Sequence, residues 1–168
     1  MRLRSRILER SLGLIAACAL SGICPVASAD HNSTSRVTNQ DRAEIVRLTL
    51  AEVLAPSSNF LSEKQSKGVV ILSSKNIKPS WVTKVEGHDV VCLTPDEIQK
   101  KANREGDFEY LYFAQFKVRG EKVLIEVVNT WAKSKGSGKG YLSGGGRTLE
   151  YSRVQAKWVS RFITGYVS

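Results

Sequence analysis

Histidine and cysteine are scarce in this 168-residue sequence, which holds two histidines and three cysteines. These residues are too few and too widely spaced for a zinc site of the usual kind. The sequence has no hydrolase motif that combines a serine, a histidine and an acidic residue, so it indicates no catalytic triad. We therefore expect no metal and no cofactor, and we predict no catalytic residue.

A phosphate-binding loop is also absent, although the glycine-rich run 136–140 has a similar composition. A P-loop needs glycine where Lys133 stands and serine or threonine where Gly140 stands. Basic residues gather around this loop without the interleaved aromatic residues of a nucleic-acid interface. We expect no nucleic-acid partner. A solvated loop explains this charge, and attraction to an anionic lipid or envelope polymer is the alternative.

The first 29 residues have the three parts of a cleavable export signal: a basic start, an apolar run and a small-residue cleavage site at 27–29. The apolar run, from Leu12 to Cys24, is too short for a transmembrane helix, which needs roughly 20 residues. We expect a periplasmic or secreted protein with no transmembrane span in its mature chain. Alternatively, residues 15–18 resemble a lipobox, in which case a lipid on Cys18 anchors the protein.

Cleavage after Ala29 leaves 139 of the 168 residues, which is enough for one domain. Cys92 is then the sole cysteine, so no disulfide forms within the mature chain. It lies in an apolar run and is interpreted as a small core residue rather than a reactive thiol. Residues 30–40 are polar and aperiodic, which predicts a disordered lead-in before a single domain over 41–168.

Hydrophobic periodicity predicts a helix over residues 41–54, with Asn39 as its N-cap. A capping box at residues 94–97 starts a second helix that extends to about Arg104. Runs of strand character occupy 69–72, 90–93, 108–118, 122–133, 147–154 and 157–166. This order predicts the α+β class: an N-terminal helix packed on a curved antiparallel sheet with a four-stranded C-terminal meander.

The turn at 119–121 predicts a register for the first long hairpin, because a one-residue slip exchanges the faces of a strand. If Val118 pairs with Val123, Tyr112 pairs with Asn129 and Tyr110 with Trp131, while Glu109 and Glu126 lie on the opposite face. In the second hairpin, pairing of Arg153 with Trp158 places Glu150 opposite Arg161.

This register defines a candidate ligand-binding site of four residues at one end of the covered face: Tyr110, Tyr112, Asn129 and Trp131. Small-molecule sites are mostly apolar pockets with a few convergent polar groups, which fits this set. The alternative is that the aromatic residues belong to the core, and that their polar groups find partners at its edge.

The element order resembles the cystatin-like roll, particularly the nuclear-transport-factor-2-like superfamily, over residues 41–166. The shared features are an N-terminal helix, an intervening helix and a long meander whose last strand carries Trp158. The resemblance implies a cone-shaped cavity, which members use as isomerases, dehydratases, ligand-binding proteins or interaction modules. No family site residue matches a position here, so none is carried over.

These observations favour an exported, non-catalytic module that binds a small apolar ligand or an envelope protein in the mouth of the roll. One alternative is a pocket enzyme of the same fold, with isomerase- or dehydratase-like proton transfer. That enzyme would need a carboxylate or histidine inside the cavity. A second alternative is a purely structural interaction protein, whose cavity is filled by its own side chains.

Overall fold

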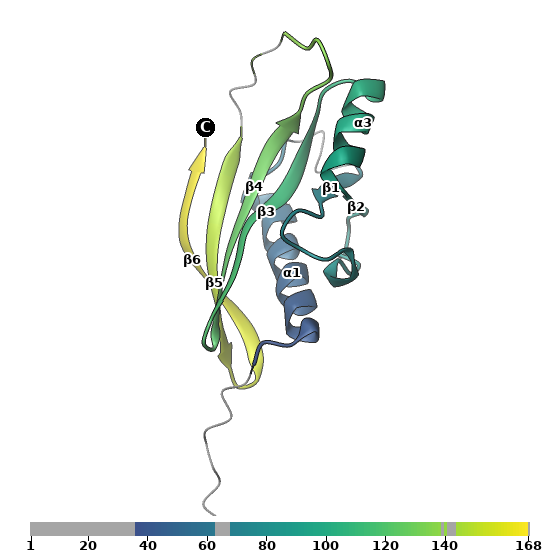
Figure 1. Ribbon diagram of the computed structural model, residues 1–168. Coiled ribbons are helices and arrows are strands. Elements are labelled where there is room, and N and C mark those ends of the chain that lie inside the picture. Colours follow the sequence, from purple (N-terminus) through teal and green to yellow (C-terminus); the bar gives the residue numbers. More distant parts are fainter. Residues whose placement is uncertain (1–35, 63–67, 139, 141–143, 168) are drawn as a thin grey trace, which may run out of the picture. The chain divides into compact units, whose positions relative to one another are not determined.

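The computed structural model describes residues 36–62, 68–138, 140 and 144–167, all within the unit Thr34–Ser168. The predicted export signal, Cys18 and residues 30–35 lie outside the described residues. The described part contains helices and strands, so the α+β class is confirmed (Figure 1). Its elements are α1 (Asn39–Leu54), η1 (Pro56–Ser58), β1 (Val70–Ser73), η2 (Pro79–Trp81), β2 (Val90–Leu93), α3 (Pro95–Glu105), β3 (Phe108–Arg119), β4 (Lys122–Ala132), β5 (Gly145–Val154) and β6 (Lys157–Val167).

The strands form one mixed sheet in the order β2-β1-β3-β4-β5-β6. From β3 to β6, each strand pairs antiparallel with the next. β1 pairs parallel with both β2 and β3, so the prediction of an antiparallel sheet is wrong for these pairs. The reason is that residues 74–89 and α3 carry the chain back along the sheet before the next strand begins, as a parallel connection requires.

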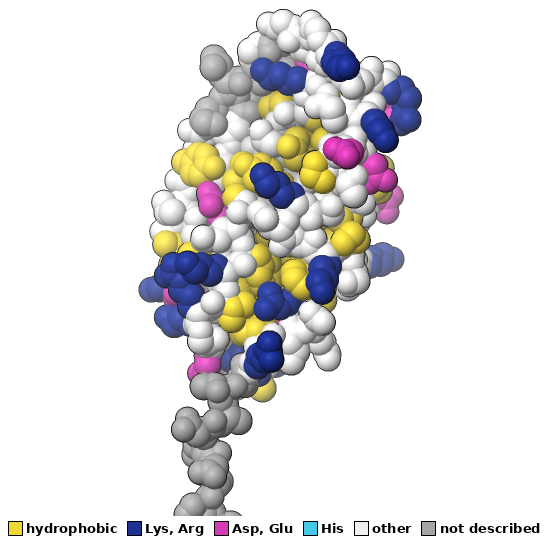
Figure 2. Space-filling view, viewed as in Figure 1, with side chains coloured by type: hydrophobic (Ala, Val, Ile, Leu, Met, Phe, Trp, Pro, Cys, Tyr) yellow, Lys and Arg dark blue, Asp and Glu magenta, His cyan; other side chains and the backbone are white. Residues whose placement is uncertain are grey.

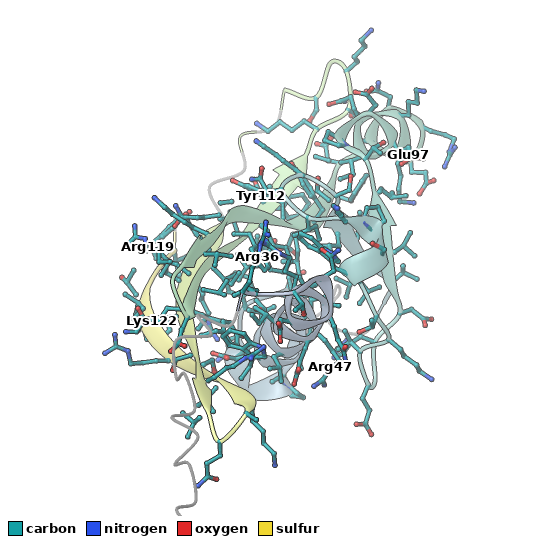
Figure 3. All side chains as sticks on the ribbon, turned by 60° about the horizontal axis from the view of Figure 1, so that its bottom comes forward. Arg36, Arg47, Glu97, Tyr112, Arg119 and Lys122 are labelled. Carbon is teal, nitrogen blue, oxygen red and sulfur yellow. The ribbon has the colours of Figure 1, made fainter. Side chains whose placement is uncertain are left out.

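The two helices cover opposite faces of the sheet. Val70 and Leu72 of β1 belong to the large core cluster of α1, whereas Ile71 between them belongs to a smaller cluster with Ile98 of α3. Successive strand residues point to opposite faces, so we distinguish an α1 face from an α3 face. Figure 1 shows α3 beside the C-terminal end of β4. The β3–β4 turn, flanked by Arg119 and Lys122, which Figure 3 labels, is at the N-terminal end of β4.

The start of α1 differs from its prediction. Thr38, rather than Asn39, is the N-cap: its Oγ1 accepts a hydrogen bond from the Asp41 N–H at 3.1 Å. The Asp41 carboxylate in turn accepts one from the Thr38 N–H at 2.8 Å. This capping box selects Thr38, because an acid three residues after the cap satisfies a second free N–H. Residues 39 and 40 of the predicted lead-in are therefore helical. The capping box of α3 at Thr94 and Glu97 is confirmed.

Asp41 also connects α1 to the last hairpin. It is 9% exposed and accepts hydrogen bonds from Trp158 Nε1 at 3.0 Å and from the Arg153 guanidinium. Arg153 and Trp158 are cross-strand partners in β5 and β6. Burial raises the pKa of Asp41, but hydrogen bonds from Thr38, Trp158 and Arg153 outweigh burial and hold this pKa well below its ordinary range.

The first long hairpin keeps its predicted register only near the turn. Val118 pairs with Val123, as predicted. The register then shifts between Phe113 and Gln115, where Ala114 is an extra residue in β3. This β-bulge exchanges the faces of all β3 residues before it in the chain, relative to the prediction.

Asn76, in the loop after β1, supports the bulge. Its Nδ2 donates hydrogen bonds to the carbonyl oxygens of Phe113 at 2.9 Å and Ala114 at 3.1 Å. These carbonyls flank the irregular point of the strand, so the side chain satisfies groups that the bulge disturbs. Asn76 has a φ of 65°, a conformation that asparagine tolerates better than most residues.

The second hairpin has its predicted register from the turn to the pair Leu149 and Phe162, after which the register shifts and Ile163 is an extra residue in β6. Arg153 lies opposite Trp158, and Glu150 lies opposite Arg161. The Arg161 guanidinium is 3.1 Å from the Glu150 carboxylate. β5 begins at Gly145, two residues earlier than predicted, because the glycine-rich end of the preceding loop pairs with both β4 and β6.

Replacing the Asp41 carboxylate tests its role as a connector. We expect Asp41→Asn to lower the free energy of unfolding by about 2–4 kcal/mol at pH 7, because Arg153 and the helix N-terminus lose a buried charged partner. The stabilisation is fully present above the unfolded-state pKa of about 3.9 and fades as the pH falls below it, since the folded-state pKa is lowered. Urea unfolding should therefore show that Asp41→Asn lowers the free energy of unfolding by roughly 1 kcal/mol less at pH 3 than at pH 7.

The control for this prediction is Glu44→Gln, which removes an exposed acid from the same helix. We expect it to change the free energy of unfolding by less than about 0.5 kcal/mol. An Asp41→Asn loss that is equally large at pH 3 and pH 7 would show that the ionised form of the carboxylate is not what stabilises the fold.

The contribution of the Asn76 side chain to the stability of the bulge can be tested with Asn76→Gly. This substitution keeps the positive φ but removes the side-chain donor. We expect a loss of about 1–2 kcal/mol in chemical denaturation, because two strand carbonyls lose their side-chain partner. Asn59→Gly is the matched control, since Asn59 also has a positive φ, of 48°. Equal effects of both substitutions would attribute the loss to the backbone rather than to the bulge.

Candidate functional site

The structure divides the four predicted site residues between the two faces of the sheet. Tyr110 packs against the small cluster under α3, and Tyr112 lies on the same face opposite Val128. Asn129 and Trp131 lie on the α1 face. The prediction that these side chains share one face is wrong, because the bulge at Ala114 shifts Tyr112 and Tyr110 by one position relative to β4.

Tyr110 and Tyr112 form an aromatic pair instead of a pocket wall. Their ring centroids are 6.1 Å apart, and the Lys75 ammonium lies 5.8 Å from the Tyr112 ring. Burial raises the pKa of both phenols, so they remain protonated at neutral pH. Figure 3 shows Tyr112 at β3, well apart from the labelled Glu97 of α3.

A pocket of about 700 Å³ opens where α3 meets β1, β2 and the start of β3. Its wall includes Val69 and Val91, which are 52% and 42% exposed, so apolar surface in the pocket faces solvent. The other apolar wall residues are Ile71, Leu93, Phe108 and Trp131. The polar and charged residues of the wall are Ser62, Glu97, Lys100, Lys101, Arg104, Asp107 and Glu109.

The carboxylates of the pocket are engaged by donors of the protein itself. Glu97 accepts hydrogen bonds from the N–H and hydroxyl of Thr94, both at 2.8 Å, and these bonds lower its pKa. Asp107 accepts bonds from the N–H and hydroxyl of Ser134, at 2.7 and 2.8 Å. Both carboxylates therefore serve the local backbone and neighbouring hydroxyl groups.

Three cations of α3 lie beside the apolar wall. Lys101 and Arg104 pair with Glu105, and the Lys101 ammonium also lies 5.7 Å from the Phe108 ring. Lys100 has no hydrogen-bond or ion-pair partner among the described residues, although its charge contributes to lowering the pKa of Glu97. Figure 2 shows basic and acidic side chains close together around α3, at the upper right.

Glu109 also lines this pocket. It lies on the α1 face opposite Trp131, whereas the predicted register placed it on the face away from Trp131. It accepts hydrogen bonds from Ser62 Oγ at 2.6 Å and from Asn129 Nδ2. Asn129 is 6% exposed, and its Nδ2 also donates to the carbonyl of Phe60 at 3.0 Å. Asn129 thus supports the pocket from behind, through Glu109 and the chain segment after α1.

The sequence contains one signal for this site that the predicted site did not include. Glu97, Lys100, Lys101 and Arg104 recur at i, i+3, i+4 and i+7, which places them on one helical face. Ile98 and Ala102 form the buried face of the same helix. The position of Val69 beside α3 had no local signal, because it depends on the parallel pairing of β1.

Among the described residues, no three histidine, cysteine or acidic side chains lie close enough to hold a metal ion, and no helix has the length and apolar character of a membrane span. Cys92 is half-buried, not fully buried as interpreted from the sequence. Burial and the charge of Glu97 raise the pKa of its thiol, which disfavours the reactive thiolate.

Comparison of the chain with protein-family models, curated proteins and solved structures finds no significant match. The resemblance to cystatin-like and nuclear-transport-factor-2-like proteins therefore stays a prediction. Only the geometry of the pocket and its charges bears on function.

The support of the pocket by Asn129 can be tested with Asn129→Asp. We expect a loss of about 2–4 kcal/mol in the free energy of unfolding at pH 7, because the new carboxylate faces Glu109 and the Phe60 carbonyl. The loss should shrink toward pH 4, since a carboxyl with a raised folded-state pKa is protonated there. Asn103→Asp is the control, because its exposed Oδ1 already accepts two hydrogen bonds.

Proposed function

We propose that the protein binds a small amphipathic molecule in the pocket beside α3. The apolar part of the ligand lies on Val69, Val91 and their neighbours, and an acidic group of the ligand lies near Lys100. The observation that carries this proposal is an exposed apolar wall directly beside a lysine that has no ion-pair partner among the described residues.

The size and composition of the pocket support a small-molecule ligand. A volume of about 700 Å³ lies within the usual range for ligand sites, roughly 300–1,000 Å³. Ligand pockets are mostly apolar with a few polar groups that fix orientation, as here. The exposure of Val69 and Val91 has a physical cost in water, which a bound apolar group removes.

Electrostatics favour an acidic head group over a basic one. The carboxylates of Glu97 and Asp107 accept hydrogen bonds within the protein, whereas the Lys100 ammonium remains available to a ligand. The formal net charge of the whole sequence is +9, and the four arginines and one glutamate of residues 1–29 leave +6 on residues 30–168, which attracts anions over longer distances.

Proton transfer by Glu109 is the second candidate function, because this carboxylate lines the pocket. Ser62 and Asn129 donate to its two oxygens, one each. Both oxygens of this carboxylate are thus engaged by donors of the protein itself. Binding without chemistry is therefore favoured over an isomerase- or dehydratase-like reaction.

We further propose that the domain is a roll of the cystatin-like type and that the chain is exported. The first proposal is supported by α1 packing on one face of a sheet with four successive antiparallel strands. The parallel strands β1 and β2 depart from a purely antiparallel sheet. The second proposal rests on the sequence of residues 1–29 alone.

Calorimetric titration with three twelve-carbon probes tests the ligand proposal: laurate, 1-dodecanol and dodecyltrimethylammonium. We expect laurate to bind at least about tenfold more tightly than the other two, equivalent to about 1.4 kcal/mol. Lys100→Glu should remove this preference and leave dodecanol binding unchanged. Val91→Asp should weaken the binding of laurate and dodecanol alike, because both place their chains on the apolar wall.

Lys117→Glu, an exposed charge change of the same sign on β3, is the matched control and should leave all three affinities unchanged. Equal binding of the three probes, or laurate binding that survives Lys100→Glu, would contradict the proposed head-group site. Failure of every probe to bind would contradict the ligand pocket itself.

A further inference from the structure

The outer edge of β6 is the long exposed edge of the sheet. The sheet ends at β2 on one side and at β6 on the other. β2 has 4 residues, whereas β6 has 11. Within residues 36–62, 68–138, 140 and 144–167, no strand pairs with the outer side of β6. Such an edge presents free N–H and C=O groups to another strand.

The β5–β6 turn determines which residues of β6 present these groups. Gln155 and Ala156 have φ values of 48° and 63°, which matches a two-residue type I′ hairpin. The closing pair of such a hairpin, Val154 and Lys157, is hydrogen-bonded, and bonded pairs alternate with non-bonded pairs along an antiparallel ladder. The backbone groups of Trp158, Ser160 and Phe162 therefore point away from β5.

Exposed apolar side chains concentrate on the same hairpin. Among the described residues, eight large hydrophobic side chains are exposed, and two of them, Val69 and Val91, line the pocket. The other six are Val154, Val159, Phe162, Ile163, Tyr166 and Val167. Monomeric proteins commonly protect an edge strand by proline, shortness, a β-bulge or inward-pointing charge. β6 has no proline and is long, and its one register shift against β5 leaves Ile163 as an extra residue, so the strand is regular from Trp158 to Phe162. Its exposed apolar residues mark an interaction surface.

We propose that β6 pairs antiparallel with β6 of a second copy of the chain, about a two-fold axis at Ser160. In this register Trp158 of one copy lies opposite Phe162 of the other, which makes two aromatic cross-strand pairs on the α1 face. The strand is self-complementary here because its aromatic residues stand two positions before and two positions after Ser160. A closed dimer of this kind buries the same edge in both copies.

Charge selects the antiparallel arrangement. The charged residues of β6 are Lys157 and Arg161. In the proposed register they lie opposite Ile163 and Val159, so no like charges face each other directly. A parallel, in-register pair would place lysine on lysine and arginine on arginine. Arg161 is also neutralised within its own copy by Glu150, at 3.1 Å.

Sedimentation equilibrium of the chain as recovered from cells, from about 1 μM to about 300 μM, tests the proposal. We expect a reversible dimer. Ser160→Pro removes an N–H that points away from β5, and it should weaken dimerisation at least about tenfold while preserving the far-ultraviolet circular dichroism spectrum. Ser160→Ala is the matched control: it loses the hydroxyl bond to Glu52 but keeps the N–H, and it should remain dimeric.

Ser160→Cys in a Cys92→Ser background decides the register even if the proline variant fails to fold. Paired residues at a two-fold axis have Cα atoms about 5.5 Å apart, within disulfide range, so mild oxidation should give a covalent dimer. Lys157→Cys in the same background should not cross-link. A chain that stays monomeric at every concentration, or that binds only other proteins, overturns the proposal. So does a dimer that persists in Ser160→Pro or does not cross-link at position 160.

Discussion

The buried carboxylate of Asp41 is the interaction on which the arrangement of α1 and the sheet depends. It completes the N-terminal cap of α1 with Thr38, and it accepts hydrogen bonds from Arg153 of β5 and Trp158 of β6. One side chain thus orients the first helix relative to the last hairpin, more than 100 residues later in the chain. A buried charge is costly unless donors surround it, and here the donors come from three separate elements, so the charge favours one arrangement of those elements.

The bulge at Ala114 has a comparable effect on the other end of the sheet. It moves Glu109 to the α1 face and Tyr110 and Tyr112 to the α3 face, and so it decides which side chains surround the pocket. The amide of Asn76 stabilises the bulge from a loop 38 residues away from Ala114. The pocket is therefore a product of strand irregularity and not of the hairpin pattern alone, which agrees with the frequent occurrence of bulges beside functional sites.

The exposed large hydrophobic side chains in the described part of the chain lie in two places: the pocket beside α3 and the β5–β6 hairpin. The first is concave and bordered by cations, whereas the second is a strand edge with an aromatic residue on either side of Ser160. These shapes suit different partners, a small amphipathic molecule and a second strand. The two places use different strands, β1 and β2 against β6, so a dimer through β6 leaves the residues of the pocket wall outside the paired edge.

The sequence by itself determined the elements whose signals are local. The capping box at Thr94, the two tight turns and the register of the β5–β6 hairpin depend on residues within a few positions of one another, and each is found where the sequence predicts it. Only the tertiary structure decided the parallel placement of β1, the contact of Asp41 with Arg153, and the faces of Tyr112 and Asn129. The physical reason is that these features depend on donors and neighbours distant in sequence, such as Asn76 at the bulge and Arg153 at Asp41, which no local pattern reports.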